Sequence, residues 1–247
     1  MAASGRRDPS KPQGLSAHLK GHIFLFEKRG APAYGAAAGL RLLLIFVALE
    51  GILGPRLAFF GLLRLPIPPS WIRVPLQLGL ALLAVRLIAG LKPAQIGFHP
   101  WRDWSRTEKS YFVQTVLLAN LIFSIVLAAR LGPMFEETSR WTSLGTVFLP
   151  LFLFGFYQEV MYRGILQTEL MRRWGAPLGI LVSNSLYTLG PLHFYHFSGT
   201  SPALPMFAAI FAIGLFFALL FKRSGNLWMV AIFHGIGNAY IVGTLPP

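Results

Sequence analysis

The sequence predicts an all-α fold, a multi-pass transmembrane helical bundle of about seven to eight spans. Three observations predict it. Hydrophobic residues make up 54% of the 247 positions. Charged residues make up only 13%, roughly half their usual share in a soluble domain. The apolar residues also fall into long runs separated by polar loops, and at ~20 residues a span the chain has room for seven or eight crossings.

Seven apolar runs supply these spans. They cover residues 36–63, 71–91, 111–131, 144–170, 176–194, 203–221 and 226–244. The first run is long, and Gly54-Pro55 should kink it or split it into a span and a surface helix. Because no repeat or linker marks a second domain, we expect a basic arm at residues 1–35 and one transmembrane domain at residues 36–247.

The formal charge of +13 follows from membrane topology rather than from a nucleic-acid partner. Lys and Arg gather at the ends of apolar runs, and 14 of the 22 fall in the amino-terminal arm and in alternate loops. This bias places the amino terminus in the cytoplasm and the arm on anionic lipid. The arm lacks the short apolar core of a secretory signal. We expect a multi-pass protein of the cell membrane, and the Arg-rich, Lys-poor composition favours a bacterial inner membrane.

The chain contains no cysteine, which excludes disulfides, a thiolate nucleophile and Cys-ligated zinc. Six polar side chains nevertheless lie inside apolar runs. They are Gln158, Glu159, Arg163, His193, His234 and Asn238. Ionisable groups are costly in hydrocarbon, so they usually face the bundle interior and mark a functional site. Their types suit acid–base or metal chemistry better than ion permeation.

Glu159 and Arg163 are four residues apart and share a helix face. A buried pair keeps both side chains charged, but such pairs fix helix register about as often as they serve chemistry. Gln158 lies about 100° round the helix from Glu159, so both can border one cavity.

Each histidine taken alone is more often a helix–helix hydrogen-bonding residue than a catalyst. Pro191 should bend the span that carries His193 and open room for a ligand or water. His234 and Asn238 share a face at i and i+4, and the neighbouring glycines should admit another helix or a substrate backbone. The combination of two histidines, a Glu–Arg pair and an amide favours a catalytic centre within the membrane.

Three motifs in order carry a resemblance to a known family. They are Gln158-Glu159-x-x-x-Arg163, Leu189-x-x-x-His193 and His234-x-x-x-Asn238. Residues 144–244 resemble the CPBP family of intramembrane proteases, which includes the CAAX prenyl endopeptidases and bacteriocin-processing relatives. The family pattern is E-E-x-x-x-R, F-x-x-x-H and H-x-x-x-N or -D. This chain departs from it at Leu189 and, more seriously, at Gln158, because an amide cannot take a proton from water.

The resemblance implies an intramembrane endopeptidase that cleaves a membrane-associated protein or peptide, of CAAX type or at a C-terminal sorting tail. In the family the first Glu and the His of the second motif activate water. The second Glu pairs with the Arg, and the His and Asn of the third motif polarise the scissile carbonyl. Glu159 is then the remaining carboxylate base of this chain, and its environment suits a base near neutral pH.

Two other functions stay open: an inactive relative that binds membrane-protein segments, and a small-solute transporter, against which no inverted repeat is visible. We expect no cofactor. If a metal takes part, the three ligands would be Glu159, His193 and His234, a set that leaves an open position on zinc.

Overall fold

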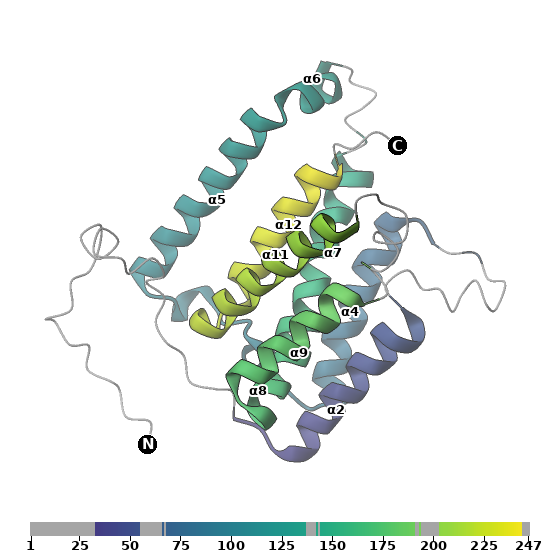
Figure 1. Ribbon diagram of the computed structural model, residues 1–247, viewed down its shortest axis with the longest axis vertical. Helices are drawn as coiled ribbons and strands as arrows, with labels where there is room; N and C mark the ends of the chain where they lie inside the picture. Colours follow the sequence, from purple (N-terminus) through teal and green to yellow (C-terminus); the bar gives the residue numbers. More distant parts are fainter. Residues whose placement is uncertain are drawn as a thin grey trace, which may run out of the picture.

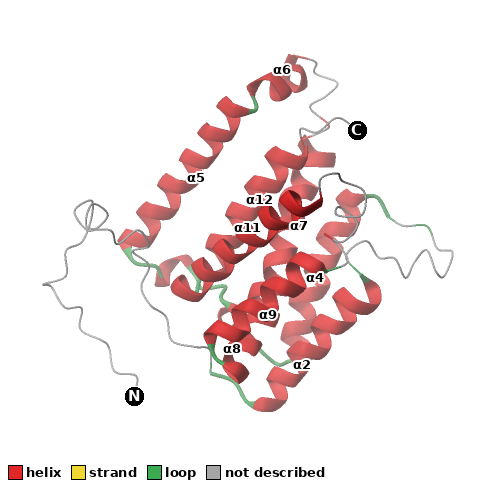
Figure 2. Ribbon diagram, in the orientation of Figure 1, coloured by secondary structure: helices red, strands yellow, loops and turns green. Residues whose placement is uncertain are grey.

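The computed structural model describes residues 33–54, 66, 68–136, 142, 144–190, 193 and 203–243. Within these residues every regular element is a helix, as the red ribbon of Figure 2 shows. This confirms the all-α expectation. Residues 1–32, which make up most of the expected basic arm, lie outside the described residues.

The described helices pack together as a bundle (Figure 1). Their bounds are α2 (Ala36–Phe46), η1 (Val47–Leu53), α4 (Ser70–Leu87), η2 (Pro93–Ile96), η3 (Trp101–Asp103), α5 (Arg106–Val126), α6 (Ala128–Glu136), η5 (Leu144–Phe148), α7 (Leu149–Glu159), η6 (Val160–Gln167), α8 (Thr168–Trp174), α9 (Ala176–Leu189), α11 (Ala203–Ser224) and α12 (Leu227–Gly243).

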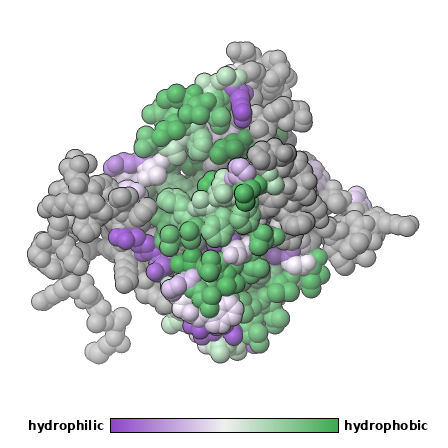
Figure 3. All heavy atoms as spheres, in the orientation of Figure 1, coloured by the Kyte–Doolittle hydropathy of each residue, from purple (hydrophilic) through white to green (hydrophobic). Residues whose placement is uncertain are grey.

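Four of the described helices are long and apolar enough to cross a membrane, judged by length and composition. They are Ser70–Leu87, Arg106–Val126, Leu144–Trp174 and Ala203–Ser224. The face seen in Figure 3 is largely hydrophobic over these helices, with hydrophilic residues confined to small patches. A bundle that exposes apolar side chains on its outside is stable in lipid, where no water has to be ordered around them. The multi-pass helical bundle is therefore confirmed.

Two described helices end inside the runs expected from the sequence. The first helical run stops at Leu53, because Gly54 takes a φ of 69°, which glycine adopts at little cost. This agrees with the break expected at Gly54-Pro55, although Pro55 itself lies outside the described residues. α9 ends at Leu189, and His193 is again helical after the bend at Gly190, so it follows α9 rather than lying on it.

A continuous helical stretch from Leu144 to Trp174 runs through the middle of the bundle. It changes from α-helix to the wider π-helix at Val160 and back at Thr168. Such π segments are rare and are often found at functional sites. The expected span 144–170 is therefore present, but it is wound more loosely than the 3.6-residue period assumes at Leu144–Phe148 and at Val160–Gln167.

Close contact between α7 and α12 depends on two glycines. A Cβ on Gly155 would lie 2.8 Å from the backbone nitrogen of Gly235, and a Cβ on Gly235 would lie 2.8 Å from the carbonyl oxygen of Phe152. The expected close approach at Gly235 is thus confirmed. At Gly237 no described helix comes close, because a Cβ there would meet nothing within 4 Å, and the space stays open for a substrate backbone.

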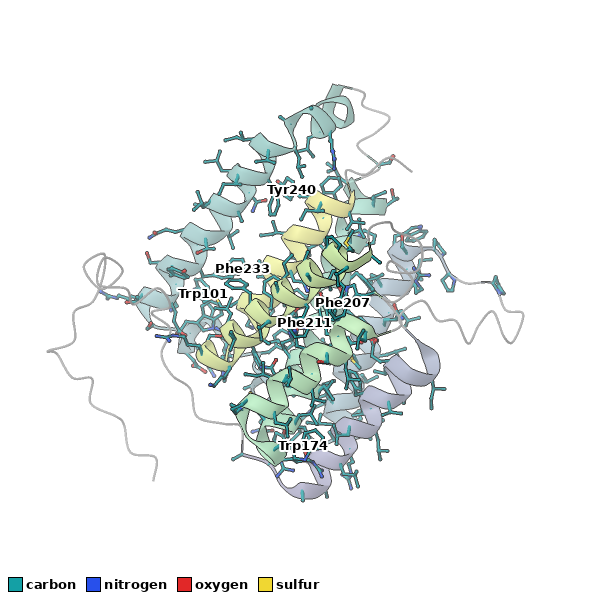
Figure 4. The ribbon with its side chains drawn as sticks, viewed as in Figure 1. Trp101, Trp174, Phe207, Phe211, Phe233 and Tyr240 are labelled. Atoms are coloured by element: carbon teal, nitrogen blue, oxygen red, sulfur yellow. The ribbon has the colours of Figure 1, made fainter. Side chains whose placement is uncertain are left out.

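α5 stands apart on one side of the bundle (Figure 1). Aromatic side chains join it to α12. Phe112 of α5 lies 6.1 Å from Phe233, and Phe123 lies 5.4 Å from Tyr240, measured between ring centroids. Phe233 and Tyr240 are labelled in Figure 4 on the side of α12 that faces α5. The opposite side of α12 is left for the polar residues of the site.

Candidate active site

Glu159 is at the centre of the buried polar residues. Its Oε1 accepts a hydrogen bond from Nδ1 of His234 at 2.6 Å, and its Oε2 lies 3.2 Å from Nε of Arg163. Glu159 is fully buried, and His234 is 7% exposed. Glu159 ends α7, Arg163 lies in η6 and His234 comes from α12. The close packing of α7 on α12 therefore brings a carboxylate and an imidazole together across two helices.

Arg163 fixes this group to two further helices. Its Nη2 donates a hydrogen bond to the carbonyl oxygen of Gly214 in α11 at 2.7 Å. Its guanidinium carbon lies 4.3 Å from the ring centroid of Tyr187 in α9, a cation–π contact. A buried charge needs such compensation, because desolvation costs more than one ion pair returns. Arg163 thus ties the Glu159 carboxyl group to α9 and α11.

His193 joins the group through the backbone of α9. Its Nδ1 lies 2.8 Å from the carbonyl oxygen of Tyr187, and the two rings meet edge-on at 4.6 Å. Because a carbonyl oxygen only accepts, the ring hydrogen must be on Nδ1, and Nε2 is then the basic nitrogen. The same reasoning applies to His234, whose Nδ1 faces the carboxylate of Glu159.

Tyr187 contacts both histidines and the arginine, and sequence reasoning missed it. Its hydroxyl lies 3.5 Å from Nε2 of His234, the outer limit of a hydrogen bond. A signal was present in the sequence: a tyrosine inside an apolar run has a hydroxyl that needs a partner when it is buried. That signal is weak, because tyrosine also belongs at membrane interfaces.

Gln158 and Asn238 form a separate pair on the same two helices. Nδ2 of Asn238 donates to Oε1 of Gln158 at 3.3 Å. The Nε2 of Gln158 is buried without a hydrogen-bond partner among the described residues. An amide N–H₂ held away from water is a hydrogen-bond donor ready for an incoming acceptor.

The structure thus places the six sequence-predicted residues in three linked parts. Glu159 contacts both Arg163 and His234 directly. His193 reaches this triad through Tyr187. Gln158 and Asn238 form their own hydrogen bond beside it, since Gln158 precedes Glu159 and Asn238 lies one turn after His234.

The residues proposed for a metal do not fit one. Both oxygens of Glu159 are occupied, one by an N–H of His234 and the other by a guanidinium that repels a cation. Across the described part of the chain, no three His, Cys, Asp or Glu side chains are placed to hold a metal ion. We therefore derive no step through zinc at Glu159, His193 and His234.

A cavity of about 500 Å³ lies elsewhere, between α5, α7 and α12. It is lined on α12 by Ile236 and Tyr240 among others, and Ile236 is about 200° round the helix from His234. Its wall is mostly apolar, apart from Asn120, Ser124 and the Tyr240 hydroxyl. The cavity and the polar group are therefore on different sides of α12.

One comparison with known proteins gives a family. The model of the type II CAAX prenyl endopeptidase Rce1-like family matches residues 118–240. Residues 118–240 belong to the CAAX prenyl endopeptidase family. Searches of the curated proteins and of the solved structures found no match. The matched range contains all six polar residues and Tyr187, and it confirms the resemblance that the three motifs carry. The matched part of the chain thus belongs to a peptidase family, and the apolar helices indicate a membrane protein.

Proposed function

We propose that this protein is an intramembrane endopeptidase that cleaves a membrane-associated protein or peptide, in the manner of CAAX or C-terminal tail processing. Its place would be the cell membrane, as a multi-pass protein of the bacterial inner membrane with a cytoplasmic amino terminus. The observation that carries the proposal is the 2.6 Å hydrogen bond between Glu159 and His234. Both residues are buried in the helical bundle, and both lie within the residues that match a peptidase family. A carboxylate–imidazole pair in a dry site is a device for moving a proton.

The proposed base is His234, oriented by Glu159. Oε1 of Glu159 accepts the hydrogen bond from His234, and Oε2 forms the ion pair with Arg163 without a hydrogen bond, so we assign Glu159 the role of orienting the imidazole. Nε2 of His234 takes a proton from water while the water oxygen bonds to the scissile carbonyl carbon. The proton on Nε2 then passes to the leaving nitrogen as the C–N bond breaks. The anionic Glu159 stabilises the transient imidazolium.

The amide pair Gln158–Asn238 is proposed as the donor side of the site. The Nε2 hydrogens of Gln158 have no partner among the described residues and can point to the oxygen that becomes negative on attack. One such donor typically lowers the activation barrier of acyl transfer by about 3–4 kcal/mol. His193, with its hydrogen held by the Tyr187 carbonyl, contributes a second basic nitrogen near the reacting centre.

A second candidate function rests on Gln158 itself. The family has a carboxylate at this position, and an amide cannot act as a base. A relative that keeps the ion pair and the histidines but has lost this carboxylate could bind a membrane-protein tail without cutting it. The two candidates predict the same binding but opposite outcomes for cleavage.

The deciding experiment uses the purified protein in lipid nanodiscs with a library of membrane-protein tails, including prenylated CAAX peptides. Mass spectrometry reads cleaved bonds. Time-dependent products with wild-type protein support the peptidase, whereas retention of peptides without products supports the binding protein. If neither products nor bound peptides are found, both candidates are wrong.

Two substitutions that exchange a carboxylate and an amide then test the roles of Glu159 and Gln158. Glu159→Gln should abolish cleavage, because the amide no longer stabilises an imidazolium on His234. Gln158→Glu keeps the shape and restores the family's carboxylate, so it should leave cleavage intact or raise it. Activity that appears only in Gln158→Glu would identify the natural chain as inactive. Equal cleavage by Glu159→Gln and the natural protein would remove Glu159 from the mechanism.

A further inference from the structure

Glu50 is a buried carboxyl group outside the residues that match the family. It lies in the π-helix η1, where its neighbours Val47 and Ile52 are 53% and 64% exposed, whereas Glu50 is only 3% exposed. The helix therefore directs its one acidic side chain inward and its apolar side chains outward. An ionisable group buried in a membrane helix is costly, which indicates a role for it.

The partner of Glu50 is a tyrosine of the central helix. The Tyr162 hydroxyl donates a hydrogen bond to Oε2 of Glu50 at 3.2 Å. Tyr157 is a second hydroxyl-bearing neighbour of the same carboxyl group. Among the described residues Glu50 forms no ion pair, and its Oε1 has no hydrogen-bond partner. Unlike Glu159, it interacts with phenols and not with a cation.

Tyr162 leads from Glu50 to the site. Its ring meets the ring of Tyr187 edge-on, with centroids 5.3 Å apart and planes at 80°. A Cβ on Gly190 would lie 2.8 Å from the Tyr162 hydroxyl, so Tyr162 packs closely against this glycine. The Gly190 carbonyl accepts the backbone N–H of His193 at 3.1 Å. Tyr162 thus supports both the ring that touches His234 and the turn that carries His193.

The link between Glu50 and the histidines is packing rather than a proton path. In the described structure no hydrogen bond joins the hydroxyls of Tyr162 and Tyr187. The contact between these two residues is the edge-on packing of their rings. What Glu50 can do is hold the Tyr162 hydroxyl in one position, so that the ring has one orientation. Supporting side chains of this kind keep a catalytic group within the few tenths of an ångström that its geometry requires.

We propose that Glu50 is a positioning residue, which through Tyr162 and Tyr187 sets the geometry of His193 and His234. This proposal rests on the proposed function where it concerns catalysis, but the geometry of the histidines can be tested without a substrate. It gives the amino-terminal helices, which lie outside the matched residues 118–240, a part in the site. The contact that carries the proposal is the hydrogen bond from the Tyr162 hydroxyl in η6 to the Glu50 carboxyl group in η1.

The test compares three variants that change one half of the contact at a time. Glu50→Leu removes the acceptor, Tyr162→Phe removes the donor, and Glu50→Gln keeps an acceptor oxygen. We expect kcat per folded molecule to fall about tenfold in the first two with little change in KM, and less than about threefold in Glu50→Gln. Because both changes break one contact, the double variant Glu50→Leu with Tyr162→Phe should be no slower than either single variant.

Spectroscopy of ¹⁵N-histidine-labelled protein supplies the readout that needs no activity. The ring resonances of His193 and His234 should shift in Glu50→Leu and Tyr162→Phe, whereas those of His99 should not. Glu108→Leu is the matched control: Glu108 is a fully buried carboxyl group in the capping box at the start of α5, so its loss should lower stability alone.

The outcomes separate the two proposals. Shifted resonances in a protein without peptidase activity support the positioning role and overturn the proposed function. Unchanged resonances and unchanged kcat in Glu50→Leu and Tyr162→Phe overturn the positioning role, whatever the activity. If Glu50→Leu does not fold, Tyr162→Phe and Glu50→Gln carry the same comparison. In a further outcome the yield falls, but kcat per folded molecule and the histidine resonances stay as in the natural protein. Glu50 is then structural only, and the positioning role is overturned.

Discussion

The central helical stretch Leu144–Trp174 and the outlying α5 are both long and apolar, but they differ in what they bury. In the most apolar 18 residues of Leu144–Trp174, 44% of the residues are buried. In the most apolar 18 residues of α5, none is buried. The central helix carries Gln158, Glu159 and Arg163, each at most 2% exposed. Hydropathy alone would class the two as equivalent spans, so burial of polar groups, not apolar character, distinguishes the helix that builds the site.

The difference follows from the environment of each helix. α5 needs only to be apolar, because lipid solvates its outer faces as well as another helix would. The central helix buries charged groups that need partners, and α9, α11 and α12 supply several of them, although Nε2 of Gln158 stays without one among the described residues. We therefore expect substitutions in the central helix to be severe and those at α5 to be mild.

The largest effect is expected at the buried ion pair. Arg163→Ala strands the fully buried Glu159 carboxylate and should destabilise the protein by about 3–5 kcal/mol. Protein yield and thermal unfolding in detergent measure this. Arg172→Ala is the matched control: Glu169 keeps Arg173 as a partner, and Arg172 is partly exposed, so the change should be below about 1 kcal/mol. Equal losses in the two variants would mean that burial does not set the value of the Glu159 ion pair.

A smaller effect is expected where helices touch through glycine. Gly235→Ala adds a Cβ that would lie 2.8 Å from the Phe152 carbonyl oxygen, so α7 and α12 must separate, at a cost of about 1–3 kcal/mol. Gly237→Ala, two residues along the same helix, meets open space and should be neutral or stabilising by up to about 1 kcal/mol. Thermal unfolding compares them. Because His234 precedes Gly235, peptidase activity should fall in Gly235→Ala alone, and loss in both variants would contradict this.

A mild effect is expected on the side of α12 that faces α5. The Tyr240 hydroxyl donates to Oδ1 of Asn120 at 3.1 Å and lies 3.4 Å from the hydroxyl of Ser124. Tyr240→Phe removes these contacts and should cost about 0.6 kcal/mol, the average found for hydrogen bonds between membrane helices. Unfolding in detergent measures the change, and kcat should stay as it is. A loss of activity comparable to that of Glu159→Gln would place α5 in the site after all.

No effect is expected from metal removal. Since an arginine and an N–H group engage both oxygens of Glu159, peptidase activity should survive chelators, and purified protein should contain no stoichiometric zinc. The measurements are metal analysis and activity in phenanthroline. Loss of activity that zinc restores and magnesium does not would overturn this and make Glu159, His193 and His234 the ligands.

The sequence by itself determined the helical membrane fold, because apolar runs of this length are stable only as helices in lipid. It also identified the six polar residues, since each is costly in hydrocarbon whatever its neighbours are. The pairing of Glu159 with Arg163 followed from spacing within one helix, a local property.

Only the tertiary structure decided which residues of different helices meet. Nothing in the sequence places Nδ1 of His234 on Glu159, or Tyr187 between two histidines and an arginine, because these contacts join residues far apart in the chain. The same applies to Glu50, whose partner Tyr162 lies 112 positions away. Local patterns fix how a helix is made and which side chains need partners. The packing of whole helices, set here by the glycine contact of α7 with α12 and by π-helical winding, fixes which partners they find.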